Sequence, residues 1–185
     1  MMASVHEFNR LPADAARKAL RQCCSSGRWV DAVLAGRPYT DTEALLAASD
    51  AAVAGLTATD LSEALAGHPR IGERRAGWSG QEQAGVSGAG DKLRRALADG
   101  NAAYEQRFGH IYLACATGRD AAELLAFLHE RLGNDRKTEW GVVASELAKI
   151  NQIRLRKLLQ CDSGVADEPS AAVAARNGGS DGRPS

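Results

Sequence analysis

The chain of 185 residues carries 23 Lys and Arg against 23 Asp and Glu, so its formal net charge at pH 7 is zero. No basic block outruns its acidic neighbours, and we therefore expect no nucleic-acid partner. The length suits a single domain with a buried core, and no run approaches the roughly 20 apolar residues of a membrane-spanning helix, so we expect no membrane partner either.

Helical patterns follow one another along most of the chain. Apolar residues recur at helical spacing, Asp41 or Thr42 stands at a helix start as N-cap, and Gly36 and Gly67 stand at helix ends. The predicted helices comprise residues 11–24, 28–36, 41–56, 57–67, 90–108, 120–132 and 136–160. Only residues 110–116, HIYLACA, look extended, and so short a run cannot build a sheet alone.

Two regions follow from this pattern. Residues 1–160 are predicted to form a single-domain, all-α irregular helical bundle of about seven to nine helices. Residues 161–185 are small, polar and punctuated by Gly, Ser and Pro, so they lack the apolar surface that ordering requires. We expect them to form a disordered C-terminal tail.

The fourth predicted helix ends in a polar loop, AGHPRIGERRAGWSGQEQAGV, at residues 66–86. His68 follows the helix stop at Gly67, and Pro69 pushes it out of the α region into an extended conformation. The negative end of the helix dipole favours a protonated imidazole, which would suit a proton donor near neutral pH. A lone loop histidine is also typical of an ordinary surface residue, so both interpretations stay open.

The same loop ends in SGQE, residues 79–82, which matches the capping-box pattern. In that motif Ser79 accepts a backbone N–H of the following helix and Glu82 reaches back to the cap residue. Capping explains both residues but leaves Gln83 unexplained. A ligand-binding or catalytic role for Glu82 therefore remains open beside the structural one.

The last predicted helix contains an arginine in its apolar stripe. At about 100° per residue, Arg154 falls among apolar side chains that share one face of the helix. These are Val143, Leu147, Ile150 and Leu158. Burying an unpaired charge costs several kcal/mol, so we expect Arg154 to form an internal salt bridge, to extend to solvent at the helix end, or to bind an anionic ligand.

Taken in order, these pieces resemble a known enzyme family. They are GHPRIGE, SGQEQAGV, GNAAYEQRFGHIYLACATGR and LAKINQIRLRKLL. Together they are similar to the 2-oxo-4-hydroxy-4-carboxy-5-ureidoimidazoline (OHCU) decarboxylase family over about Phe8 to Leu159. The resemblance implies an all-α, typically homodimeric enzyme that needs no cofactor and no metal. It also implies conversion of OHCU to (S)-allantoin, with stereospecific protonation, in the breakdown of urate and other purines.

The resemblance also assigns roles to residues of this chain. It implies that His68 is the catalytic acid and base, and that Glu82 works with it. It implies a substrate-binding set that includes backbone groups of the extended segment and a cation for the substrate's negative charge. That set is Pro69, Ser79, Gln83, Tyr112, Leu113, Ala114, Cys115, Ala116 and Arg154. Since the chain ends Arg-Pro-Ser, unlike a peroxisomal address, and its N-terminus has no apolar signal region, we expect a cytoplasmic protein.

Two other classes of function fit the sequence less well. A helical interaction module gives no reason for the polar loop or for an arginine in the apolar stripe. A thiol peroxidase or reductase needs an activated cysteine, but Cys115 has no CxxC partner. A zinc hydrolase is disfavoured as well, because the four histidines are scattered and no HExxH motif occurs.

Overall fold

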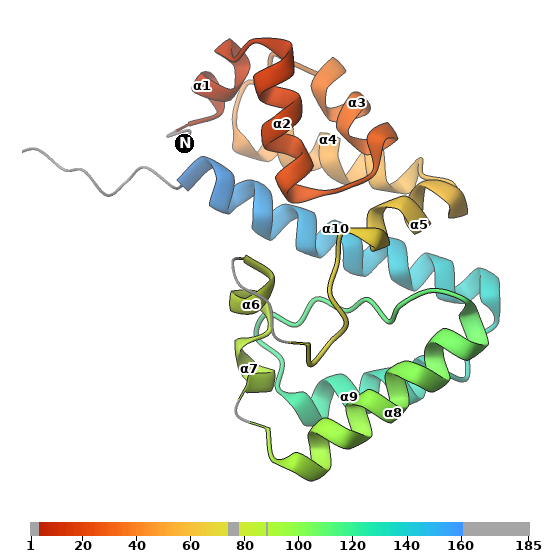
Figure 1. Ribbon diagram of the computed structural model, residues 1–185. Coiled ribbons are helices and arrows are strands. Elements are labelled where there is room, and N and C mark those ends of the chain that lie inside the picture. The colour runs from red at the N-terminus through yellow and green to blue at the C-terminus, as the bar shows by residue number, and fades with distance from the viewer. Residues whose placement is uncertain (1–3, 74–77, 88, 161–185) are drawn as a thin grey trace, which may run out of the picture.

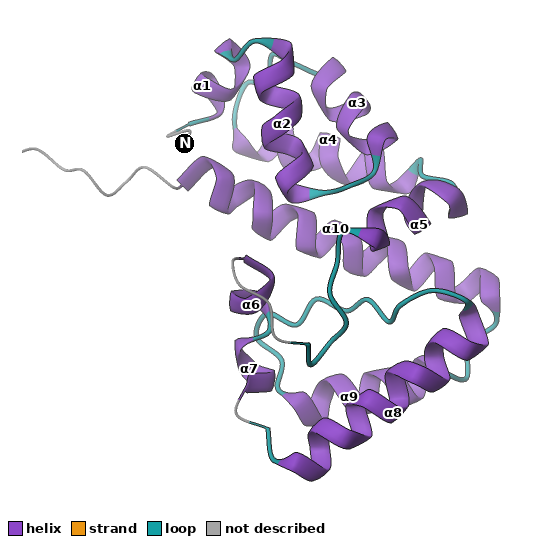
Figure 2. Ribbon diagram, in the orientation of Figure 1, coloured by secondary structure: helices purple, strands orange, loops and turns teal. Residues whose placement is uncertain are grey.

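The computed structural model describes residues 4–73, 78–87 and 89–160, and within these ranges it contains ten helices and no strand (Figures 1 and 2). The helices are α1 Val5–Arg10, α2 Ala13–Cys23, α3 Gly27–Ala35, α4 Thr42–Ala54, α5 Ala58–Ala66, α6 Trp78–Glu82, α7 Ala84–Ser87, α8 Asp91–Phe108, α9 Ala121–Arg131 and α10 Arg136–Gln160. The predicted all-α fold is confirmed. The three short helices α1, α6 and α7 raise the count above the predicted number. The predicted tail lies outside the described residues.

The helix boundaries follow the local signals of the sequence. The Asp41 carboxylate accepts the Ala44 N–H at 2.8 Å and so caps α4. Gly36 and Gly67 are the C-caps of α3 and α5, as predicted. Among the described residues, no single helix is long and apolar enough to cross a membrane. Helices α4 and α5 reach that length and composition only as a pair bent by 118°.

Helices α1 to α5 form one half of the molecule, with α2, α4 and α5 packed directly against α10 (Figure 1). The core of this half is apolar and closed to solvent, with Trp29 fully buried at its centre. The Trp29 indole N–H donates to both the carbonyl and the hydroxyl oxygen of Ser49, at 3.3 Å each. A buried tryptophan is therefore satisfied without access to water.

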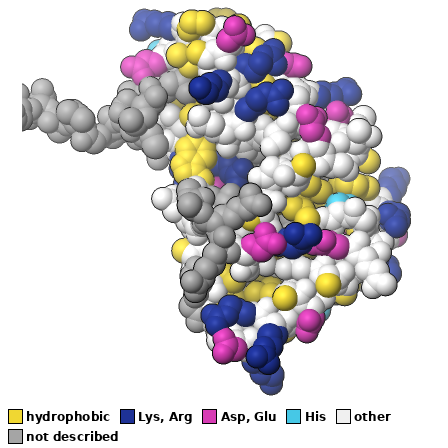
Figure 3. Space-filling model, in the orientation of Figure 1, with side chains coloured by type: hydrophobic (Ala, Val, Ile, Leu, Met, Phe, Trp, Pro, Cys, Tyr) yellow, Lys and Arg dark blue, Asp and Glu magenta, His cyan; other side chains and the backbone are white. Residues whose placement is uncertain are grey.

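Helices α8 and α9 pair to form the other half (Figure 1). Gly100 stands in the middle of α8, where a Cβ atom would lie 3.0 Å from a methyl carbon of Leu128. The glycine therefore lets α9 approach closely. The second apolar core lies around this pair and is centred on the fully buried Tyr104. On the face shown in Figure 3, acidic and basic side chains are interspersed over the surface.

The predicted extended segment lies between the two cores. It forms no strand, but its side chains alternate as those of an extended chain do. Leu113 and Cys115 belong to the first core, and the partly buried Ile111 packs against it. Tyr112, Ala114 and Ala116 belong to the second core. Residues 110–116 thus form a wall segment that lies between the two halves. This explains why residues 111–116 are apolar on both sides of the segment.

Buried carboxylates of α10 fix the backbone of this wall. Glu139 accepts hydrogen bonds from Arg131, and the Arg131 guanidinium in turn donates to the Leu113 carbonyl at 2.6 Å. Seven residues further along α10, Glu146 accepts the Cys115 N–H at 2.8 Å. Both carboxylates are buried, and residues seven apart share one face of a helix. Helix α10 therefore holds the wall at two positions, two helical turns apart.

We predict that Glu139→Ala strongly destabilises the protein. Arg131 is 1% exposed, so the variant leaves an uncompensated buried guanidinium, which costs about 3–5 kcal/mol. Glu43→Ala is the control, because the Glu43 side chain is 75% exposed in its pair with Arg156 and its loss should cost less than about 1 kcal/mol. Urea unfolding measures both, and equal losses in the two variants would contradict the assigned role of Glu139.

Candidate active site

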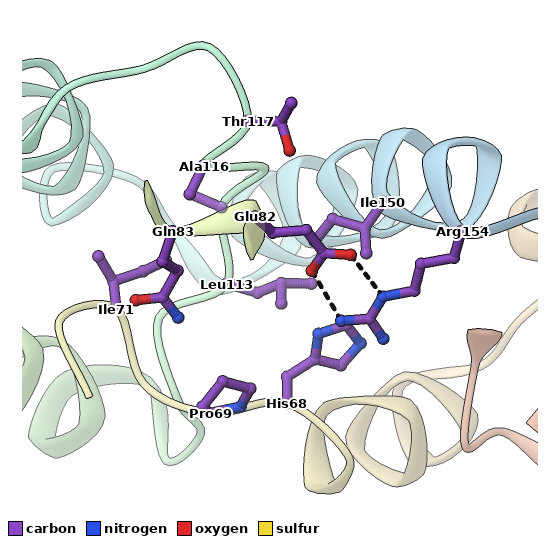
Figure 4. A pocket seen from close by; sticks show the side chains of 11 residues that line it. His68, Pro69, Ile71, Glu82, Gln83, Leu113, Ala116, Thr117, Ile150 and Arg154 are labelled. Carbon is purple, nitrogen blue, oxygen red and sulfur yellow. Dashed lines mark hydrogen bonds and ion pairs between the residues drawn. The ribbon is translucent and has the colours of Figure 1, made fainter. Parts of the chain in front are cut away.

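A pocket opens where four parts of the chain meet (Figure 4). They are the loop after α5, the end of α6, the wall segment and the middle of α10. The residues that line it are His68, Pro69, Ile71, Glu82, Gln83, Leu113, Ala114, Ala116, Thr117, Ile150 and Arg154. The enclosed cavity measures about 20 Å³, which is room for about one water molecule.

Arg154 points into this pocket from the apolar stripe of α10. Its Nε and Nη2 donate to the two carboxylate oxygens of Glu82 at 2.9 and 2.8 Å, a bidentate pair in which the side chains are 7% and 9% exposed (Figure 4). Its Nη1 donates to the Cys23 carbonyl at 3.2 Å. Of the three expected outcomes, the structure therefore shows the internal salt bridge. The pair also lines a pocket, so the guanidinium lies where an anion could bind.

Glu82 does not act as the predicted helix cap. Helix α6 begins at Trp78, so Ser79 lies inside the helix rather than at its N-cap. Both carboxylate oxygens of Glu82 are engaged by Arg154 instead. The Ser79 side chain lies outside the described residues.

His68 is 9% exposed, and its ring lies beside the Arg154 guanidinium (Figure 4). Burial, with a smaller contribution from the Arg154 charge, lowers the pKa of His68 from 6.5 to about 3. The expectation of a protonated imidazole at the helix end is therefore wrong for this state, because desolvation outweighs the helix dipole. Its Nε2 is buried and has no hydrogen-bond partner among the described residues. A buried imidazole with an unsatisfied nitrogen is typical of a ligand-binding position.

Gln83 fixes the loop that carries His68. Its side-chain oxygen accepts the Gly72 N–H at 2.8 Å, and its side-chain nitrogen donates to the Arg70 carbonyl at 3.2 Å. Gly72 has a φ of +93°, a backbone conformation that favours glycine. The amide of Gln83 lines the pocket, and it also positions the pocket's loop through these two bonds.

The wall segment contributes some of the predicted residues and not others. Leu113, Ala114 and Ala116 line the pocket. The Tyr112 hydroxyl instead donates to the Leu124 carbonyl at 3.0 Å in the second core. Cys115 belongs to the first core and is not among the lining residues.

The sequence analysis did not single out three lining residues, Ile71, Thr117 and Ile150, as site residues. Ile150 lies on the same stripe as Arg154, so helical spacing could have indicated it. Thr117 follows the extended segment directly. The sequence around Ile71 contains no pattern that identifies it as a site residue. Among the described residues, no group of three or more His, Cys, Asp or Glu side chains lies close enough to hold a metal ion.

Comparisons with known proteins point to one family. A family model described as OHCU decarboxylase matches residues 9–156. The chain is 31% identical over 160 residues to the uric acid degradation bifunctional protein TTL of Arabidopsis thaliana, covering 81% of this chain and 49% of that protein. It is 32% identical over 140 residues to the 2-oxo-4-hydroxy-4-carboxy-5-ureidoimidazoline decarboxylase of Amia calva, covering 70% and 79%. The chain thus spans about half the length of the plant relative.

Solved structures give the same picture. The fold is similar to that of an OHCU decarboxylase crystallised in the presence of (S)-allantoin, with a TM-score of 0.68 and 29% identity over 75% of this chain and 95% of that one. It is also similar to an (S)-allantoin synthase, with a TM-score of 0.66 over 84% and 54%. The identity there is 19%, so that likeness supports the fold alone.

We predict that His68 makes the stability of the protein depend on pH. The unfolded chain takes up a proton near pH 6.5, whereas the folded state does so only near pH 3, so folded stability is complete above the first value and falls as pH drops toward the second. Between pH 7 and pH 5, His68 should account for a loss of about 2 kcal/mol.

His68→Asn removes this titration and should flatten the pH dependence by that amount. Urea unfolding of both proteins at pH 7 and pH 5 measures the difference. Equal pH dependence in the two proteins would show that His68 is not held neutral in the folded state.

Proposed function

The chain belongs to the OHCU decarboxylase family, and we propose that it converts OHCU to (S)-allantoin in urate degradation. The observation that carries this proposal is the pocket in which Arg154, Glu82 and His68 meet. It offers a cation for a carboxylate and a neutral imidazole with an unsatisfied nitrogen. The relatives support the same reaction, because one is named for OHCU decarboxylation and another for uric acid degradation.

The reaction needs few chemical groups. The bond between the ring carbon and the carboxylate breaks, carbon dioxide leaves, and the electron pair is delocalised into the imidazoline ring. The carbon that lost the carboxylate becomes a carbonyl as its hydroxyl loses a proton, and a proton is added to the neighbouring ring carbon from one face to give allantoin. Arg154 binds the substrate carboxylate, because a guanidinium matches a carboxylate with two parallel hydrogen bonds.

His68 serves as the proton carrier. As a neutral imidazole it accepts the proton of the substrate's 4-hydroxyl group and returns it to the neighbouring ring carbon. Because the ring of His68 is fixed beside Arg154, it approaches that carbon from a single face. Glu82 works with His68, because the negative charge of Glu82 favours the protonated form of His68 during the transfer. One further proton from solvent balances the departure of carbon dioxide.

Hydrogen-bond donors of the pocket stabilise the charge that develops on the ring. Within the part of the chain that the structure describes, the N–H groups of Ala114 and Ala116 have no backbone acceptor. Both residues line the pocket, so their amides can serve ring oxygens, as in an oxyanion hole. Pro69, Ser79, Gln83 and Leu113 complete the proposed substrate contacts. We propose that Tyr112 and Cys115 do not contact the substrate and instead anchor the wall segment in the two cores.

A thiol-based reaction is disfavoured by the described cysteines. Cys23, Cys24 and Cys115 are all buried. Burial raises the pKa of the Cys23 thiol to about 12 and also raises the pKa of the Cys24 and Cys115 thiols. A reactive cysteine needs the opposite shift.

The resemblance to the family also supports a homodimer, and we propose that the chain forms one. We also propose a cytoplasmic location. The dimer is tested by analytical ultracentrifugation of the full chain, where sedimentation at the mass of a monomer would contradict it. The location is tested by fractionating cells that express the tagged full chain.

We predict that His68→Asn abolishes stereoselective turnover, because an amide of similar size keeps the fold but cannot carry a proton near neutral pH. OHCU is generated in situ from urate, and circular dichroism follows the allantoin formed. Wild type should give a fast signal of one sign. The variant should give only the slow, optically silent decay seen without enzyme. His129→Asn is the control, since His129 is exposed and is not among the lining residues, and it should behave as wild type.

Optically active allantoin formed by His68→Asn at the wild-type rate would overturn the assignment of His68. If wild type itself gave no acceleration and no optical signal, the proposed decarboxylation would be wrong.

A further inference from the structure

We propose that Glu82 occupies the place of the substrate carboxylate on Arg154 before OHCU binds, is displaced when OHCU binds, and returns when carbon dioxide leaves. This carboxylate exchange rests on the proposed function, because it concerns how the same pocket selects its substrate and releases its product. It makes Glu82 a residue that sets specificity for an anion, in addition to its place beside His68.

The geometry of the pair is the first argument. Glu82 meets Arg154 through both carboxylate oxygens, at 2.9 and 2.8 Å, which is the arrangement a bound carboxylate ligand would adopt. Among the described residues that line the pocket, Arg154 is the only lysine or arginine. A carboxylate that enters the pocket therefore has to compete with Glu82 for this one guanidinium.

The space available is the second argument. With Glu82 on Arg154, the cavity of about 20 Å³ holds about one water molecule. An imidazoline ring with a carboxylate and a ureido group does not fit beside the pair. Substrate binding therefore requires the pocket to widen, and separation of the pair widens it at the guanidinium that would bind the carboxylate.

The anchoring of the two residues identifies which one moves. Arg154 stands within the 25-residue helix α10, and its third nitrogen is held by the Cys23 carbonyl of α2. Glu82 is the last residue of α6, a helix of 5 residues. Its described hydrogen bonds are those to Arg154. Arg154 is therefore the fixed member, and Glu82 is the one displaced.

The exchange favours binding of the substrate and release of the product. The substrate carries a carboxylate and displaces Glu82, whereas allantoin is uncharged and has no group that competes for Arg154. In the overall step, the substrate anion and one proton become carbon dioxide and a neutral product. Return of Glu82 to the guanidinium then favours product release. The affinity of the pocket for a carboxylate is accordingly lower than that of a site whose arginine is already free.

The test compares two stable probes that share the ring of the substrate and differ only in the charged group. They are 2-oxoimidazolidine-4-carboxylate and its uncharged parent, 2-imidazolidone. Isothermal titration calorimetry measures their affinity for wild type and for Glu82→Gln. Because the glutamine no longer competes as an anion, the variant should bind the carboxylate about tenfold or more tighter. The affinity for 2-imidazolidone should change by less than about twofold.

Glu43→Gln serves as the matched control, because it removes an exposed carboxylate that pairs with Arg156 on the surface. It should leave both affinities at the wild-type values. If Glu82→Gln does not fold, Glu82→Asp replaces it: the shorter side chain keeps the charge but cannot reach Arg154 with both oxygens, so it also should bind the carboxylate tighter. A variant that binds the carboxylate no tighter than wild type overturns the exchange.

These binding measurements do not depend on turnover. Failure of the wild type to form optically active allantoin would refute the proposed function, whatever the probes show. Normal turnover, together with unchanged carboxylate affinity in the variants, would refute the exchange alone.

Discussion

The constraint on which the site depends is the burial of a guanidinium in the apolar stripe of α10. A buried charge without partners is too costly for a protein of this size to tolerate. Arg154 must therefore collect acceptors from elsewhere in the chain. The Cys23 carbonyl comes from the end of α2 and the Glu82 carboxylate from α6. One arginine thus brings together segments that are far apart in the sequence, since Glu82 and Arg154 are separated by 72 positions.

The same principle recurs along α10. Glu139 and Glu146 are buried on the side of the helix that faces the wall segment, and each is satisfied by groups that reach that segment's backbone. The wall in turn alternates between two cores, so its backbone polar groups lie where water is scarce. An extended segment without a neighbouring strand needs such partners. Side chains of α10 supply these partners. The buried charges therefore also fix the geometry of the pocket beside the wall segment.

The sequence predicted the features that local pattern determines and missed those that depend on the fold. Helical spacing and caps located the long helices. The apolar stripe on α10 identified Arg154 as a charged residue at a position where apolar residues are expected. The partner of Arg154 was not predictable, because the SGQE pattern of Glu82 equally fits a helix cap. The helix dipole, a local feature, favoured a protonated His68, whereas burial, which depends on the fold, keeps the imidazole neutral. Tyr112 and Cys115 do not line the pocket, although each shares its side of the extended segment with residues that do. Alternation along the segment therefore could not separate the lining residues from the others.

The balance of charge in the pocket connects its structure to its chemistry. In the empty site, the positive Arg154 and negative Glu82 cancel, and His68 is neutral. A substrate carboxylate that occupies Arg154 leaves the buried site with one excess negative charge. A low-dielectric site disfavours such an excess, and uptake of one proton from solvent removes it. Decarboxylation consumes one proton for each carboxylate lost. The arrival of the substrate anion therefore provides an electrostatic reason for the site to take up the proton that the overall reaction consumes.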